Sequence, residues 1–301
     1  MVYKNFDELV SRVKDFPNAK RVAVAAAHDH HALEAVVKAA QEGIIEPVLV
    51  GDAAKIKEIL AELGTTVDDT NIYDAPEFAD SAALAVKLVK EGKADFLMKG
   101  KLDTGILLKA VVNKETGLGT GRIMTHFAIQ KIPNYHKLLV TTDGGMMLYP
   151  TVEQKKDIIQ NAVNTLISMG YDKPKVAVLA AVEKLNPKMQ ETVDGAELKE
   201  MWQKGEITDC IVEAPISYDI AMSKDVAKIK GFESPVAGDA DILIVPNIAA
   251  GNILGKSLTI SAQAKMAGFI VGAQVPIVLT SRGATSEEKY LSLVISAAAA
   301  N

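Results

Sequence analysis

Short apolar segments alternate with amphipathic segments along almost the whole of the 301-residue chain. The apolar segments are rich in Val, Ile or Leu and lack a polar face, as strands covered by helices on both sides should. Residues 53–64 place apolar side chains on one face of a helix, and Gly64 is expected to end it. The alternation predicts an α/β fold with mainly parallel, doubly wound sheets. The predicted strands are residues 21–27, 47–51, 94–100, 137–142, 175–181, 209–214, 240–247, 268–273 and 276–282.

The number of predicted strands bears on domain organisation. So many strands would crowd one open sheet, so two α/β domains are expected. A chain of this length can bury a core in each of them. Residues 103–136 interrupt the alternation with a glycine-rich loop that comes before a strand. We therefore place a domain crossover near residue 133.

Composition and charge exclude several classes of protein. Hydrophobic residues make up 49% of the chain and charged residues 24%, which is typical of a globular protein. No apolar run reaches the ~20 residues of a membrane span, and the first residues do not resemble a signal peptide. The single cysteine, Cys210, suits a reducing cytoplasm. Because the net charge is −5, we expect no binding to nucleic acid, and any anion site must be local.

Several predicted strands end in polar residues. In open α/β sheets, ligands bind outside the carboxyl ends of the strands, where loops meet helix N-termini. The residues at these ends are Lys99-Gly100-Lys101, Thr141-Thr142-Asp143, Pro246-Asn247 and Thr280-Ser281-Arg282. They are therefore the first candidates for a ligand site.

The stretch after the last predicted strand fits an anion site. Ser281 offers a hydroxyl, Arg282 offers a planar fork that matches phosphate oxygens, and Gly283 lets an anion approach the backbone. Thr285 and Glu288 have the spacing of a capping box, whereas Glu287 has no such role. Either glutamate could instead take a proton from an incoming thiol.

Residues 246–259, PNIAAGNILGKSLT, resemble a phosphate-binding P-loop, with Gly255-Lys256-Ser257 expected to open a helix. A P-loop needs a glycine five residues before that Gly-Lys pair, and Ala250 occupies the position. Lys256 has another use, because together with Asn252 it could hold a compact anion or a carbonyl oxygen near a helix start. A nucleotide-binding enzyme of the P-loop type is therefore the weaker alternative.

Taken together, these motifs resemble the phosphate acetyl/butyryltransferase family, and most closely its butyryltransferase branch. The matching stretches are LTSRG (279–283), PNIAAGN…K (246–256), SPVAGDADIL (234–243), EKLNPKM (183–189), EAPISYDIA (213–221), TTD with Pro150, and MKG (98–100). The resemblance implies two α/β domains with a cleft between them, of the isocitrate/isopropylmalate dehydrogenase type. It also implies a discontinuous first domain, residues 1–133 plus 271–301, and a second domain, residues 134–270.

The implied reaction transfers a short acyl group, butyryl, reversibly between CoA and inorganic phosphate in a ternary complex; phosphate acetyltransferase is the alternative. CoA is then a substrate, and neither a cofactor nor a metal is expected. The resemblance gives Ser281, Arg282 and Lys256 contact with the phosphoryl end and makes Glu288, or Glu287 beside it, the base. We also expect a homo-oligomer. The residues expected to bind substrate are Thr280, Gly283, Asn247, Gly251, Asn252, Thr125, His126, Arg122 and Lys99.

Other readings of the chain carry less weight. Cys210 lies in an apolar predicted strand and is expected to pack there rather than carry an acyl group. The HDHH run at residues 28–31 has only Asp29 beside it as a carboxylate, so we predict no metal site. A dehydrogenase would need aspartates one helical turn apart, and Asp239 and Asp241 have strand spacing instead.

Overall fold

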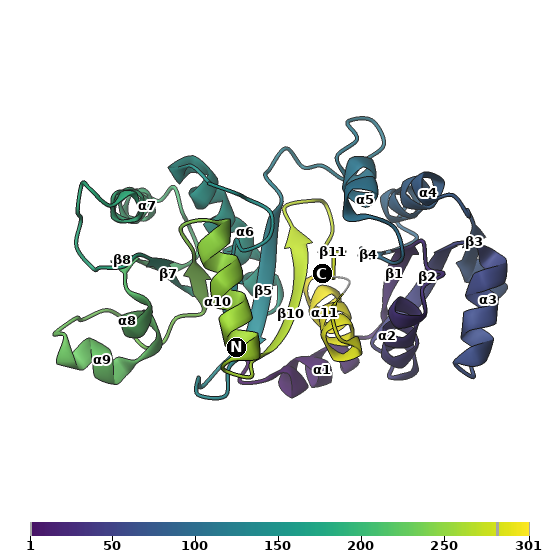
Figure 1. The fold of residues 1–301 in the computed structure, drawn as a ribbon, viewed down its shortest axis with the longest axis horizontal. Helices are drawn as coiled ribbons and strands as arrows, with labels where there is room; N and C mark the ends of the chain where they lie inside the picture. The colour runs from purple at the N-terminus through teal and green to yellow at the C-terminus, as the bar shows by residue number, and fades with distance from the viewer. Residues whose placement is uncertain (1, 281–282, 301) are drawn as a thin grey trace. The chain divides into compact units, whose positions relative to one another are not determined.

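The structure, a computed structural model, describes residues 2–280 and 283–300 (Figure 1). The chain forms two compact units, each made of segments distant in sequence. The terminal unit comprises Phe6–Arg122 and Ala267–Asn301, and the central unit comprises Met1–Asn5 and Ile123–Met266. The sequence placed the boundaries at 133/134 and 270/271 instead. The strand at 125–131 lies in the central unit because it forms an antiparallel pair with the next strand there.

The described residues of the terminal unit form six strands in the order β3-β2-β1-β4-β11-β10. All described neighbours in this order are parallel except β10 and β11. The core comprises fully buried side chains such as Val22, Leu49, Phe96 and Leu97. The strands are β1 (Lys20–Ala25), β2 (Ile45–Gly51), β3 (Ile72–Asp74), β4 (Phe96–Lys99), β10 (Lys265–Val271) and β11 (Ile277–Val278).

Helices cover both faces of the terminal sheet. The first group, α1 (Phe6–Lys14), α2 (His30–Gln41) and α11 (Ser286–Ala299), packs together on one face. The second group, α4 (Phe78–Lys90) and α5 (Thr104–Val111), packs on the other, as Figure 1 shows. Helix α3 (Ala53–Glu62) and the 3₁₀ turn η1 (Asp69–Asn71) lie beside β2 and β3. Gly64 follows α3 with φ +69°, as the sequence predicts for its end.

The central unit contains the strand order β5-β6-β9-β7-β8, in which only β5 and β6 are antiparallel. Helices α8, α9 and α10 bury apolar side chains such as Ile220, Ala227 and Leu258 in one core with β6, β7 and β9. Helices α6 and α7 pack against each other and against the strands. The elements are β5 (Thr125–Lys131), β6 (Leu139–Thr142), α6 (Val152–Ser168), β7 (Lys175–Leu179), α7 (Gln190–Gln203), β8 (Ile211–Ile216), α8 (Tyr218–Met222), α9 (Lys224–Ile229), β9 (Ile242–Ile244) and α10 (Ile248–Ile260).

The structure departs from the predicted strands in physically understandable ways. Strand β3, which has three residues, is additional. Strand β5 follows the glycine-rich loop, where a strand was expected without bounds, and it contains polar side chains that interrupt the apolar pattern. One of these, Gln130, is fully buried and accepts a hydrogen bond from Thr141 Oγ1 at 2.9 Å. Strand β9 stops before Pro246, which has no N–H for a ladder. Because β10/β11 and β5/β6 are antiparallel, the strand pairing within each unit is mixed rather than purely parallel.

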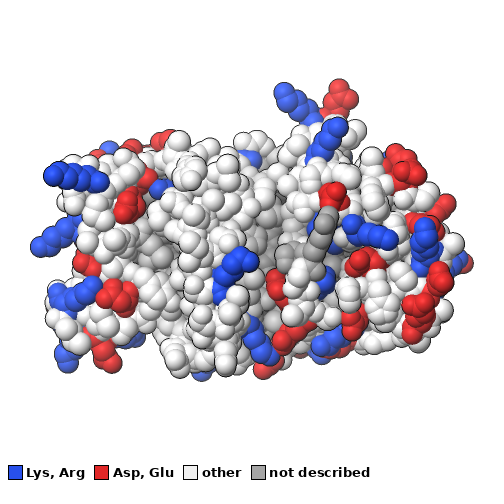
Figure 2. Space-filling model, in the orientation of Figure 1, with Lys and Arg blue, Asp and Glu red and all other residues white. Residues whose placement is uncertain are grey.

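The surface charge and the helix lengths bear on two classes of protein that the composition argues against, nucleic-acid-binding and membrane-spanning proteins. On the face drawn in Figure 2, basic and acidic residues are interspersed, and no continuous basic patch is seen. Within the described residues, no helix combines the length and apolar character that a membrane crossing requires.

Candidate active site

One buried carboxylate fixes the loop that follows β6 in the central unit. Asp143 comes directly after the strand and is 2% exposed. Its Oδ1 accepts hydrogen bonds from the N–H groups of Gly145 (2.7 Å) and Met146 (2.8 Å). Its Oδ2 accepts one from the N–H of His126 at 3.0 Å. Asp143 therefore ties the loop to the first residues of β5.

Helix α10 begins against this loop. Asn247 caps it, and its side-chain oxygen accepts a hydrogen bond from the N–H of Ala250 at 3.0 Å. A Cβ added at Gly251 would lie 2.7 Å from Gly144 Cα and 3.1 Å from the carbonyl oxygen of Asp143. Only glycine permits this approach. The predicted ligand residue Gly251 is buried and serves the packing of helix on loop.

Lys256 and Asn252 both lie on the exposed side of α10, one helical turn apart. The prediction that Gly255-Lys256-Ser257 opens a helix is wrong, because α10 already starts at Ile248 behind its Asn247 cap. Lys256 thus lies about two turns inside the helix, and no P-loop wraps a phosphate at these residues. Its ammonium group makes no ion pair with any other residue that the structure describes. Neither Asn252 nor Lys256 has a side-chain partner among the residues that the structure describes.

Two predicted substrate residues begin β5. His126 is half-buried, and burial lowers the pKa of its imidazole, an effect that the charge of Asp143 opposes. A Cβ at Gly145 would lie 3.0 Å from the ring of His126, so glycine lets the loop cover that ring. Thr125 is fully buried, and its hydroxyl accepts a hydrogen bond from Asn161 Nδ2 at 3.3 Å. His126 is the more accessible of the two for a ligand.

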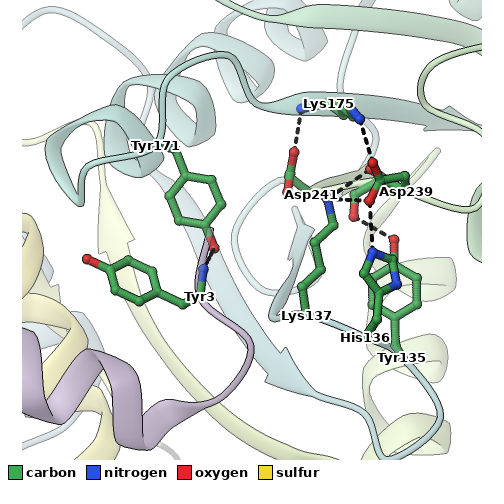
Figure 3. Close-up of polar contacts among 9 residues, drawn as sticks. Tyr3, Tyr135, His136, Lys137, Tyr171, Lys175, Asp239 and Asp241 are labelled. Carbon is green, nitrogen blue, oxygen red and sulfur yellow. Dashed lines mark hydrogen bonds and ion pairs between the residues drawn. The ribbon is translucent and has the colours of Figure 1, made fainter. Parts of the chain in front are cut away.

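The opposite, amino-terminal edge of the same sheet holds a network of paired charges (Figure 3). Lys137 Nζ lies 2.6 Å from Asp241 Oδ1 and 3.1 Å from Asp239 Oδ1. Asp239 also receives Lys175 Nζ at 2.5 Å and His136 Nε2 at 2.8 Å. Burial opposes the shift, but the hydrogen bonds from Lys175, His136 and Lys137 hold the pKa of Asp239 well below its usual range. Both aspartates are therefore committed to lysines and not arranged as metal ligands.

In the terminal unit, the predicted anion site follows β11. Ser281 and Arg282, the central residues of that prediction, lie outside the described residues. On either side of them, Thr280 is buried and Gly283 is exposed. Thr285 caps α11, and its hydroxyl accepts the N–H of Glu288 at 3.1 Å. A capped helix thus begins shortly after Gly283.

The two glutamates in the first turn of α11 differ. Glu287 is exposed, whereas Glu288 is half-buried. The second half of the predicted capping box is missing, because the Glu288 carboxylate makes no hydrogen bond with any other described residue. Burial raises the pKa of Glu288, and the nearby Lys289 only partly opposes this. A half-buried carboxylate with a raised pKa is the better placed of the two for proton transfer.

The remaining predicted contacts lie elsewhere on the terminal unit. Lys99 ends β4, and its ammonium group lies within hydrogen-bond distance of the carbonyl oxygens of Leu102 (3.3 Å) and Gly100 (3.5 Å). Arg122, which ends the first segment of the terminal unit, is exposed.

Among the described residues, the only group with metal-ligand geometry is His30, His31 and Glu34, whose ligand atoms all lie within 4.8 Å of one another. All three are exposed, and Glu34 already accepts a hydrogen bond from Ser286.

Comparison with known proteins decides the family. Residues 5–82 and 77–297 match the phosphate acetyl/butaryl transferase family. The chain belongs to this family. It is similar to a phosphate acetyltransferase from Thermotoga maritima, 45% identical over 92% of this chain and 94% of that one, and to a phosphate butyryltransferase from Clostridium acetobutylicum, 42% identical over 98% and 97%. The crystal structure of a branched-chain phosphotransacylase from Enterococcus faecalis V583 has a TM-score of 0.82 and 32% identity, and the match covers 93% of this chain and 99% of that one.

This phosphate acyltransferase is thus an enzyme with a mixed α/β fold shared with phosphotransacylases. The sequence analysis included Asp143 in the TTD strand end among the candidates for a ligand site, but it did not predict that this carboxylate fixes the loop after β6. The signal for its role is a carboxylate at a strand end followed by Gly144 and Gly145, which leave backbone N–H groups free to bind it. The isocitrate dehydrogenase-like form of the fold stays a prediction.

Proposed function

We propose that this enzyme is a phosphate butyryltransferase, which transfers a butyryl group reversibly between CoA and inorganic phosphate. Both acetyl- and butyryltransferases occur among its relatives, so the family alone does not select the acyl chain. The preference for butyryl rests on the resemblance of the motifs, above all those from residue 209 to 283, to the butyryltransferase branch. Phosphate acetyltransferase is the alternative. A cytoplasmic location and a homo-oligomeric state remain predictions.

The single observation that carries the mechanism is the state of Glu288. Its carboxylate is half-buried, has a raised pKa and is free of hydrogen bonds to other described residues. It stands in the first turn of the helix that follows the Thr280–Gly283 stretch. A carboxylate of this kind suits a general base, which takes the thiol proton of CoA as the sulfur attacks the acyl phosphate carbonyl. As the C–S bond forms, the bond from carbonyl carbon to phosphate oxygen breaks, and inorganic phosphate leaves.

Cations are needed because phosphate and thiolate are both anions. Arg282 presents a fork that matches two phosphate oxygens, and Lys256 supplies an ammonium group that has no ion-pair partner within the described part of the chain. We propose that both stabilise the charge that develops on the phosphoryl group. Ordering of the two substrates supplies part of the remaining rate. No side chain carries the acyl group, and the reaction needs neither a metal nor a cofactor.

Phosphate-dependent release of CoA tests the proposal. Purified enzyme is given butyryl-CoA or acetyl-CoA, with and without phosphate, and free thiol is measured without NAD or ATP. We expect thiol release only with phosphate, a higher kcat/KM for butyryl-CoA, and unchanged rates after treatment with a chelator. Equal release without phosphate would contradict acyl transfer to phosphate. A higher kcat/KM for acetyl-CoA would instead support the alternative.

A further inference from the structure

The terminal sheet reverses its strand order at β1. This strand pairs in parallel with β2 on one side and with β4 on the other (Figure 1). Strands β2 and β3 are therefore added on one side of β1, and β4 is added on the opposite side. In open α/β sheets, the carboxyl ends of strands at such a reversal are the preferred place for a ligand. The residues there are Ala26, Ala27 and His28 after β1, and Gly100 and Lys101 after β4.

The backbone at this point is held in an unusual conformation. Ala26 has φ +54°, which is uncommon for a residue other than glycine. The fully buried hydroxyl of Ser81 fixes it, since it accepts the N–H of Ala26 at 2.6 Å and donates to the carbonyl oxygen of Val50 at 3.1 Å. A Cβ at Gly100 would lie 2.3 Å from the carbonyl oxygen of Ala26, so β4 approaches the bend as only glycine can. Strained backbone of this kind is concentrated at functional sites.

His28 is positioned by this bend. It is 8% exposed, stacks on Phe78 and accepts the N–H of Asp52 on its Nδ1 at 3.2 Å. Because Nδ1 accepts, the ring proton of the neutral form is on Nε2. Nε2 donates to no other residue that the structure describes. Burial first, and then the charge of Lys101, lower the pKa of His28, so the ring is a neutral donor at pH 7.

Lys101 supplies a charge beside this donor. Its backbone N–H donates to the carbonyl oxygen of Ala26 at 2.9 Å, and its exposed side chain has no ion-pair partner among the described residues. The two nearby carboxylates are engaged, since Asp52 pairs with Lys55 at 2.6 Å and Asp29 accepts the N–H of Ala32 at 2.8 Å. One positive charge and one buried N–H donor are therefore left for a ligand.

We propose that Lys101 and His28 form a second phosphate-binding subsite, at the β1/β4 strand ends and additional to the stretch around Arg282. The inference rests on the proposed function for the identity of the ligand. Two sources have the required chemistry: the phosphates of CoA itself, and inorganic or acyl phosphate. A lysine and an N–H donor suit a phosphate oxygen from either source.

The test compares Lys101→Ala with Lys109→Ala, which removes an exposed lysine from α5. The KM of each variant is measured for butyryl phosphate, CoA, dephospho-CoA and pantetheine. We expect Lys101→Ala to raise the KM for CoA about tenfold, the effect of one lost charge-assisted hydrogen bond, while Lys109→Ala leaves it unchanged. An effect that vanishes with dephospho-CoA assigns the 3′-phosphate, and one that vanishes only with pantetheine assigns the pyrophosphate. A rise confined to butyryl phosphate assigns the reacting phosphate.

His28 is tested with two replacements. His28→Asn keeps an acceptor for the N–H of Asp52 but lacks the Nε2 donor, and should raise the same KM as Lys101→Ala. His28→Gln, whose longer side chain keeps a donor, should raise it less. Binding of CoA and of inorganic phosphate by calorimetry gives the same comparison without turnover, so it still reports if the wild type fails to transfer acyl groups. Equal KM values and equal affinities for Lys101→Ala and Lys109→Ala would overturn the proposal.

Discussion

Within the described part of the chain, charged residues are paired at one edge of the central sheet, where the parallel strands begin, and one lysine is unpaired beyond the other edge, where these strands end. At the amino-terminal edge, Lys137 and Lys175 are paired with Asp239 and Asp241. Beyond the carboxyl-terminal edge, Lys256 on α10 has no partner among the residues that the structure describes. Paired buried charges fix strands relative to one another, whereas an unpaired cation contributes little to folding and remains available to an anion. The contrast separates residues that maintain the fold from residues that can do chemistry.

The largest expected effect concerns the paired edge. Asp241→Ala leaves the buried ammonium of Lys137 without its 2.6 Å partner and removes the acceptor of the Lys175 N–H. We expect the free energy of unfolding to fall by roughly 3–5 kcal/mol, with activity per folded molecule retained. Denaturant titration measures the free energy of unfolding, and kinetics normalised to the folded fraction measure the activity. Asp225→Ala, at an exposed position on α9, is the control and should change neither. Lost activity in a stable Asp241 variant would contradict the contrast.

Glu288→Gln should have the next largest effect. Loss of a general base costs about 10²–10⁴-fold, and we expect about 10³-fold in kcat. Since Glu288 has a raised pKa, the acid limb of the wild-type pH profile should lie above the ordinary glutamate value of about 4.3, with activity falling as pH falls through it. The limb should be absent in the variant. Glu287→Gln is the matched control; a larger loss there than at Glu288 would assign the base to Glu287.

Arg282→Lys tests whether geometry or charge matters at the predicted phosphoryl site. Lysine keeps the charge but loses the paired N–H groups of the guanidinium fork. We expect kcat/KM to fall about 10²-fold, close to the loss of one preorganised donor, in both reaction directions. Near wild-type rates in either direction would show that Arg282 does not act through its fork.

Cys210→Ala should have the smallest effect. The thiol is 4% exposed, and burial raises the pKa of the Cys210 thiol to about 12, so it is a poor nucleophile at neutral pH. Direct transfer predicts that kcat changes less than about twofold, because the acyl group never resides on the enzyme. Initial-rate patterns should be those of a ternary complex. Ping-pong kinetics, or a large loss of kcat in a folded variant, would contradict direct transfer.

Sequence patterns predicted the layers of the fold better than its details. Apolar strands such as β1 and β2 can be recognised from their composition, because they are covered on both faces. Strand β5 cannot be delimited in this way, because it contains the buried polar residues Thr125 and Gln130, whose hydrogen-bond partners lie on other segments of the chain. The start of α10 was misplaced because Gly255-Lys256 resembles a helix start, whereas the effective signal is the Asn247 cap.

The candidate site was predictable to a similar extent. Strand ends and motifs selected Lys256 and the stretch around Arg282, because the capacity of a cationic side chain to bind an anion follows from its residue type and its place in the chain. The different burial of Glu287 and Glu288 depends on how α11 packs, and no local pattern gives it. The same holds for His28, whose role depends on the bend at Ala26 and on a neighbouring strand.

The most direct test of the proposed division between structural and chemical charges compares two lysines, one at the amino ends and one beyond the carboxyl ends of the strands of the central sheet. Lys256→Ala and Lys175→Ala are compared for melting temperature and for kcat/KM with butyryl phosphate and CoA. We predict that Lys256→Ala lowers kcat/KM about 10²-fold and leaves the melting temperature unchanged. Lys175→Ala should lower the melting temperature by a few degrees and leave kcat/KM per folded molecule unchanged. If Lys256→Ala instead lowers only the melting temperature, the unpaired cation is structural, and the proposed division between the two edges is contradicted.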